Sequence, residues 1–184
     1  MSEGPVNPVA GRACGSCTMC CKLLIVPETE SPAGEWCQHC HVGQGCRIYA
    51  DRPQRCRDFQ CGWLVWGKVP EHWFPAKSRI VVVSDGSRIT FTIDPASPAR
   101  WRDQPWFGEV KAMAVMAFAE QRQVLVRIGR KVIVMLPDRD CDLGVVADDE
   151  VVLTGLRPDG SWGAAKVHQD DPRLALGGAS VPLV

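Results

Sequence analysis

The chain has 184 residues, and its 21 Lys and Arg are balanced by 21 Asp and Glu, so the formal net charge at pH 7 is zero. This balance excludes a global electrostatic argument for nucleic acid or an acidic membrane surface as a partner. The sequence shows neither a secretory signal nor an apolar stretch long enough to span a bilayer. We therefore expect a cytoplasmic protein that binds neither membrane nor nucleic acid.

Ten cysteines are spread very unevenly along the chain. Nine of them lie in the first third, and Cys141 lies apart from the others. In the reducing cytoplasm, clustered thiols indicate metal ligands or redox groups rather than disulfides. The first part is also rich in Gly and Pro and poor in long apolar runs, as expected where a metal replaces a hydrophobic core. We predict a cysteine-cluster metal-binding domain over residues 1–75 and a second domain over 76–184.

The metal-binding domain opens with CGSCTMCC, in which Cys14 and Cys17 form one CxxC pair; Cys37 and Cys40 form another. This is the spacing of a zinc ribbon, where each CxxC turn points two thiolates the same way and two turns close a tetrahedron around the ion. The run CxxCxxC over 14–20 is equally typical of an iron–sulfur protein, although its usual continuation is missing. The remaining cysteines could form a second four-sulfur site with one to spare: Cys20, Cys21, Cys46, Cys56 and Cys61.

Charged and imidazole side chains lie among these cysteines. His39 and His41 could each replace a thiolate, although polar loop residues are the simpler interpretation. Guanidinium groups near a four-thiolate site would offset its negative charge and keep the cysteines deprotonated. The stretch CRIYADRPQRCRDFQC supplies four of them: Arg47, Arg52, Arg55 and Arg57.

Residues 76–184 have the patterns of an ordinary globular domain. The run over 105–121 begins with Pro and repeats apolar residues at helical spacing, so we predict a helix that lies across a sheet. The order of the elements predicts an α+β fold with an antiparallel sheet and one main packed helix. Runs rich in β-branched residues, paired across turn sequences, predict the strands: 79–84, 88–93, 123–128, 131–136, 150–156 and 161–167.

The order of the cysteines resembles a known family. CGSCTMCC followed by GCRIYADRPQRCRDFQC is similar to the YkgJ-type cysteine-cluster family, also described as the CxxCxxCC or zinc- or iron-chelating domain, over residues 14–66. Its members are mostly bacterial, and a related cluster in a flagellin lysine methylase implies an iron–sulfur centre. This chain departs from many relatives by having two cysteines over 37–40. The resemblance implies at least one ligand in that segment and these others: Cys14, Cys17, Cys20, Cys21, Cys46, Cys56 and Cys61.

These observations predict a metal-binding protein that holds one or two zinc ions in a thiolate cluster, with a structural or metal-handling role. The alternative is an iron–sulfur protein that acts in redox or protein-modification chemistry. No nucleotide-binding, zinc-protease or serine-hydrolase motif is present, so no catalytic residue is assigned and enzymatic activity stays open. The metal ion is the expected partner, and a protein partner stays unidentified. The predicted ligands are Cys14, Cys17, Cys20, Cys21, Cys37, Cys40, Cys46, Cys56 and Cys61.

Overall fold

The computed structural model describes residues 7–176 and 181–182, and the chain divides into two compact units. We name them the cysteine unit, Met1–Val83 with Phe91–Arg102, and the sheet unit, Ser84–Thr90 with Asp103–Val184. The division passes through the hairpin of β3 and β4, so the flanks of this hairpin belong to one unit and its tip to the other. The fold is α+β, as predicted, with the clustered cysteines in the N-terminal region.

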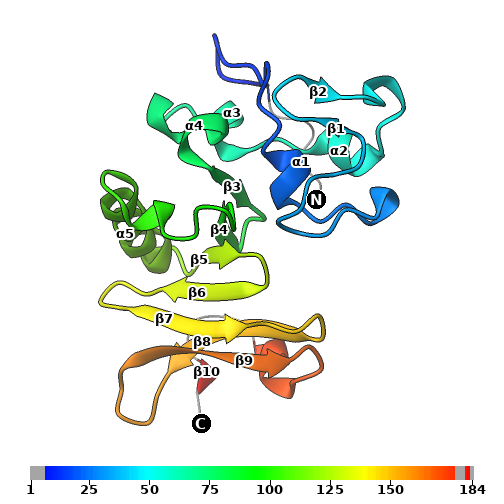
Figure 1. The fold of residues 1–184 in the computed structure, drawn as a ribbon. Coiled ribbons are helices and arrows are strands. Elements are labelled where there is room, and N and C mark those ends of the chain that lie inside the picture. Colours follow the sequence, from blue (N-terminus) through cyan, green and yellow to red (C-terminus); the bar gives the residue numbers. More distant parts are fainter. Residues whose placement is uncertain (1–6, 177–180, 183–184) are drawn as a thin grey trace. The chain divides into compact units, whose positions relative to one another are not determined.

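The cysteine unit consists mainly of short helices and turns, as its Gly and Pro content predicts. It contains a hairpin, whose strands β1 and β2 are two residues long each. Helices α1 and α2 lie near this hairpin in one part of the unit (Figure 1). A short helix, α2, begins directly after Pro53. The elements are α1 (Cys20–Leu23), β1 (Cys40–His41), β2 (Gly45–Cys46), α2 (Gln54–Asp58), α3 (Gly62–Val65), α4 (Pro75–Ser78) and β3 (Ile80–Ser84).

One apolar cluster of the cysteine unit lies beside the clustered cysteines. Met19 and Leu23 pack with Val81 of β3, and the side chains of Cys17 and Cys61 lie against this cluster. Each buried apolar side chain of this kind contributes about 1.5–3 kcal/mol relative to an exposed one. Two of the cysteines predicted as ligands therefore also take part in hydrophobic packing.

The sheet unit is built from antiparallel hairpins and one long helix. The larger sheet has the order β3-β4-β5-β6-β7, of which the first half of β4 and all of β5, β6 and β7 belong to this unit, and α5 packs against β5 and β6 (Figure 1). The smaller sheet has the order β10-β8-β9, in which β8 and β9 are antiparallel whereas β10 is parallel to β8. The elements are β4 (Arg88–Ile93), α5 (Trp106–Ala119), β5 (Gln123–Ile128), β6 (Lys131–Met135), β7 (Asp140–Val145), β8 (Glu150–Leu156), β9 (Trp162–His168) and β10 (Val181–Pro182).

The core of the sheet unit is mainly aliphatic. Val132 and Val134 of β6 pack with Leu125 and with Val152 of β8. The ring of Phe118 on α5 meets that of Trp162 edge-on, with 4.6 Å between the ring centres. None of the helices in the described ranges is long and apolar enough to cross a membrane.

Two elements of the sheet unit were not predicted. Strand β7 has acidic residues at Asp140 and Asp142, which disguise the β pattern, and the register between β6 and β7 shifts at Val132 and Ile133. Strand β10 is only two residues long, too short to give a sequence pattern. The predicted helix and the six predicted strands are present with boundaries shifted by a few residues.

Candidate metal centre

Both predicted CxxC pairs form the same kind of turn. The amide of Cys17 donates to the carbonyl oxygen of Cys14 at 2.8 Å, and that of Cys40 donates to Cys37 at 2.9 Å. Cys20 then begins α1, so the doublet with Cys21 occupies the first turn of that helix. The local geometry at each CxxC pair is thus the tight turn that a two-thiolate corner requires.

Backbone contacts bring the second CxxC pair to the doublet. The amide of Cys37 donates to the carbonyl oxygen of Cys21 at 2.8 Å. Cys40 lies opposite Cys46 in the antiparallel hairpin of β1 and β2. The thiols of Cys21 and Cys40 are hydrogen-bonded to each other. We call Cys21, Cys37, Cys40, Cys46 and Cys56 the hairpin group, because Cys56 is electrostatically coupled to three of the others.

A different set of contacts brings the first CxxC pair to Cys61. The amide of Val9 donates to the carbonyl oxygen of Leu64 at 2.9 Å. The guanidinium of Arg12 donates to the carbonyl oxygens of Trp63 at 2.5 Å and Val69 at 2.5 Å. Since Cys61 directly precedes α3, these bonds hold the residues before Cys14 beside it. The resulting trio is the arm group: Cys14, Cys17 and Cys61.

The thiols affect each other's ionisation because they lie close together. A hydrogen bond with Cys20 and burial both raise the pKa of Cys21. Burial and the charge of Cys21 raise the pKa of Cys40 to about 11. Burial raises the pKa of Cys61, and the nearby Cys14 and Cys17 add to this effect. A bound cation would reverse these effects, since it stabilises the thiolate forms that otherwise repel each other.

Cys37 is the exception among the perturbed thiols. Burial acts to raise its pKa, but hydrogen bonds from the Ser31 hydroxyl, the His39 backbone and the Thr29 hydroxyl outweigh burial and lower it. The two hydroxyl groups are themselves hydrogen-bonded to each other at 2.8 Å, and both side chains are buried. Hydroxyl donors of this kind stabilise a thiolate and orient its lone pairs.

The grouping of the cysteines differs from a zinc ribbon made from the two CxxC pairs. One pair lies with Cys61 and the other with Cys21, because the contacts that fold the chain join these segments. Cys20 connects the two groups, since it is hydrogen-bonded to Cys21 and is adjacent in the chain to the arm-group segment. Over residues 7–176 and 181–182, no three His, Cys, Asp or Glu side chains are already arranged to hold a metal ion.

The arginines predicted to face the sulfurs make other contacts. Arg57 donates to the carbonyl oxygens of Arg52 and Ala50, at 2.9 and 2.6 Å. Arg52 stacks on Tyr49, with 4.0 Å between its guanidinium carbon and the ring centre, and Arg55 lies 3.9 Å from a carboxylate oxygen of Glu28. These carbonyls lie at the end of the short 3₁₀ helix Tyr49–Asp51, where the last carbonyl oxygens lack helical partners, so they accept the guanidinium donors. The expectation that these arginines offset the charge of the cluster is therefore not supported for these three.

A buried ionic network beside the doublet was not found from the sequence. Lys22 lies in α1 directly after Cys21, and its ammonium donates to Asp94 at 2.7 Å. The guanidinium of Arg79 pairs with the other oxygen of the same carboxylate. Asp94 is fully buried, and its Oδ1 also accepts the amide of Ala96 at 2.9 Å. Lys22 and Asp94 are 72 positions apart, and neither lies in a sequence pattern that indicates this contact.

Cys141 lies in β7 of the sheet unit, opposite Val134, and packs against the aliphatic core there. Comparison of the chain with protein-family models, with curated proteins and with solved structures finds no match. The resemblance to the YkgJ-type family therefore stays a prediction that depends on the order of the cysteines.

Proposed function

We propose that the cysteine unit holds one or two zinc ions in a thiolate cluster, with a structural or metal-handling role. The observation that carries the proposal is the folding of three separate cysteine segments, 14–21, 37–46 and 56–61, into one unit by backbone contacts. The segments that carry the cysteines are short helices, short strands and turns, and such a centre would stabilise them, because metal binding contributes directly to folding. In the reducing cytoplasm that the sequence predicts, these thiols would stay available as ligands.

The two groups suggest how the ligands would divide. The hairpin group has five thiols, which exceeds the four that a tetrahedral zinc site needs. The arm group has three, so Cys20 would complete it from the neighbouring doublet. Bound zinc would supply the positive charge that offsets several adjacent thiolates. The hydroxyls of Thr29 and Ser31 would then orient Cys37, as outer hydrogen-bond donors do in thiolate sites.

Metal analysis tests the proposal directly. The full chain, purified without oxygen after growth with both zinc and iron, is expected to contain zinc in a fixed ratio and to be colourless. Cys40→Ser removes a ligand of the hairpin group and is expected to lower that ratio. Cys141→Ser is the matched control, since it removes a thiol of the sheet unit and should leave the ratio unchanged. A chain that binds no metal, or one in which both variants lose metal equally, would contradict the proposal.

An iron–sulfur cluster is the second candidate. It is favoured by the all-sulfur donor set and by the crowding of thiols around Cys21, which is coupled to Cys20, Cys37 and Cys40. Thiolates accept either zinc or an iron–sulfur cluster, so the donor set alone does not choose between them. A brown protein whose broad visible absorption is bleached by dithionite would replace zinc with this candidate. Redox or protein-modification chemistry would then be the activity to test.

A further inference from the structure

Two cysteines lie opposite each other in the hairpin of the cysteine unit. Cys40 of β1 pairs with Cys46 of β2 in antiparallel register. One position further out, the amide of Arg47 donates to the carbonyl oxygen of His39 at 2.8 Å. Opposed residues of an antiparallel pair alternate between hydrogen-bonded and non-hydrogen-bonded positions. Because the bond lies at His39 and Arg47, Cys40 and Cys46 occupy a non-hydrogen-bonded position.

This position places the two thiols within bonding reach of each other. Directly opposed side chains point to the same face of a hairpin. The α-carbons of a non-hydrogen-bonded pair lie about 4.5 Å apart, and a disulfide joins α-carbons about 4.4–6.8 Å apart. Both cysteines are free thiols. A disulfide between Cys40 and Cys46 therefore needs no rearrangement of the two strands.

The two thiols differ in their access to solvent. Cys46 is partly exposed, whereas Cys40 is 9% exposed. The turn beside Cys46 is open, because a Cβ atom placed on Gly43 or Gly45 would meet no described atom within 4 Å beyond the chain neighbours. A small oxidant can thus reach Cys46 from solvent, and Cys40 lies behind it where it can attack the oxidised sulfur.

We propose that a peroxide converts Cys40 and Cys46 into a reversible disulfide and thereby releases metal from the hairpin group. The release rests on the proposed thiolate site. The Cys46 thiolate first attacks hydrogen peroxide, so that a sulfur–oxygen bond forms, the oxygen–oxygen bond breaks and hydroxide leaves. The Cys40 thiolate then attacks this sulfur, so that the disulfide forms, the sulfur–oxygen bond breaks and a second hydroxide leaves. The two sulfurs together lose two electrons, which the peroxide takes up.

The disulfide would leave too few ligands for zinc in the hairpin group. The group has five thiols, and a disulfide that takes two of them leaves three. A tetrahedral zinc site needs four ligands, and the thiolate rather than the disulfide is the form that binds metal. Transient disulfides that sense oxidants are the kind that occurs in a reducing cytoplasm. A thiol reductant should restore both thiols and allow the metal to bind again.

The test uses the full chain loaded with zinc and treated with hydrogen peroxide. Remaining thiols are alkylated, and the tryptic peptide 23–47, which holds Cys37, Cys40 and Cys46, is weighed by mass spectrometry. We expect this peptide to lose two hydrogen atoms and to carry one alkyl group in place of three. A colorimetric indicator should report zinc release over the same time. Dithiothreitol should reverse both changes.

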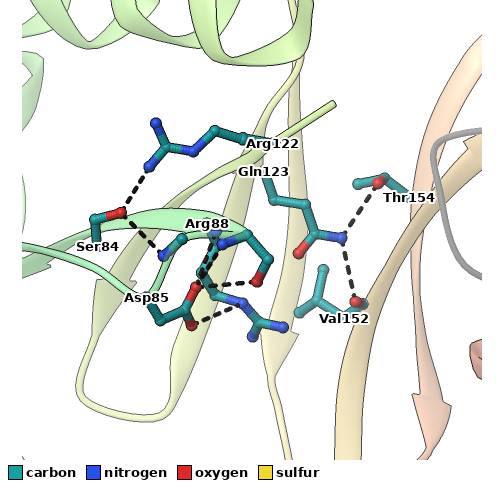
Figure 2. Close-up of polar contacts among 9 residues, drawn as sticks. Ser84, Asp85, Arg88, Arg122, Gln123, Val152 and Thr154 are labelled. Carbon is teal, nitrogen blue, oxygen red and sulfur yellow. Dashed lines mark hydrogen bonds and ion pairs between the residues drawn. The ribbon is translucent and has the colours of Figure 1, made fainter. Parts of the chain in front are cut away.

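The sheet unit provides an internal control for this treatment. Cys141 is its single cysteine, so no disulfide can form within it. The side-chain amide of Gln123 donates to the carbonyl oxygen of Val152 at 3.4 Å and to the hydroxyl of Thr154 at 3.2 Å (Figure 2). The NMR resonances of this amide should stay in place at the peroxide dose that forms the disulfide. A shift would mean that peroxide damages the whole chain, which would overturn the proposal.

Two variants identify the pair of thiols that reacts. In the metal-free chain, Cys37→Ser should still lose two hydrogen atoms from peptide 23–47, whereas Cys46→Ser should not. A disulfide in Cys46→Ser would join Cys37 to Cys40 and would overturn the assignment. A chain that forms the disulfide but never holds zinc would contradict the thiolate metal site and the release. A zinc-loaded chain that forms no disulfide in this peptide would overturn the present inference alone.

Discussion

Replacing Asp94 by Asn should destabilise the cysteine unit more than any exposed charge change. The substitution keeps an oxygen for the amide of Ala96 but removes the carboxylate that pairs with Lys22 and Arg79. The Lys22 side chain is 11% exposed, and that of Asp94 is 0% exposed, so their charges are poorly hydrated. Removing one partner of a buried pair costs about 3–5 kcal/mol. We expect about 3 kcal/mol, because the Arg79 side chain is 35% exposed and water can hydrate its charge.

Urea unfolding followed by the amide signals of residues 91–97 measures this loss in the cysteine unit alone. Asp148→Asn, at a side chain that is 94% exposed, is the control and should change little. The double variant Lys22→Met with Asp94→Asn should lose at least about 1 kcal/mol less than the sum of the single variants, since the two groups interact. Additive losses, or equal effects of Asp94→Asn and Asp148→Asn, would refute the reasoning.

The same carboxylate gives the cysteine unit a pH dependence. Burial acts to raise the pKa of Asp94, but the hydrogen bond from Lys22, the amide of Ala96 and the charge of Arg79 lower it below its ordinary value of 3.8. A lowered folded-state pKa means that the unfolded chain binds the proton more tightly. The stability is therefore complete above the ordinary pKa and is lost as the pH falls through the lower folded-state value. Asp94→Asn should remove this acid-dependent part.

Three further predictions concern the metal centre and the core. Removal of zinc by a chelator should abolish amide protection over 14–61 while the sheet unit stays folded, because a structural zinc contributes about 10–16 kcal/mol. Hydrogen exchange measures amide protection in both units. Unchanged protection over 14–61 would exclude a structural role for the metal. Acidification should release the metal, since each thiolate ligand regains a proton, and a colorimetric zinc indicator measures the release; a chain that keeps its zinc in acid would contradict a site made of ionised ligands. Val126→Ala, at a fully buried position of β5, should lower the free energy of unfolding of the sheet unit by about 2–3 kcal/mol and leave the metal content unchanged. A fall in metal content would show that metal binding depends on the stability of the sheet unit.

Most strands could be predicted because their signals are local. Asp85 and Gly86 mark one hairpin turn and Gly129 another, and the β-branched runs beside them form strands close to the predicted limits. Strand β7 could not be predicted, because it carries acidic residues in place of a β-branched run and its pairing depends on β6. A strand can thus be predicted from the local sequence only where that strand has its own run of apolar residues.

The grouping of the cysteines depends on contacts that spacing does not encode. Spacing predicts the turn at each CxxC pair, and both turns are present. Which turns meet is decided by distant bonds, such as the amide of Cys37 to Cys21 and the guanidinium of Arg12 to Trp63. The contact between Lys22 and Asp94 is equally remote in sequence. A sequence alone therefore indicates a thiolate centre but not how its ligands divide.

X-ray absorption at the zinc edge of the anaerobically purified chain tests the central claim most directly. A thiolate cluster predicts a first shell made of sulfur at about 2.3 Å, with about four sulfurs per zinc. Cys141→Ser should leave this spectrum unchanged, since Cys141 lies in the sheet unit. A first shell of nitrogen and oxygen at about 2.0–2.2 Å would contradict the claim that the clustered cysteines hold the metal.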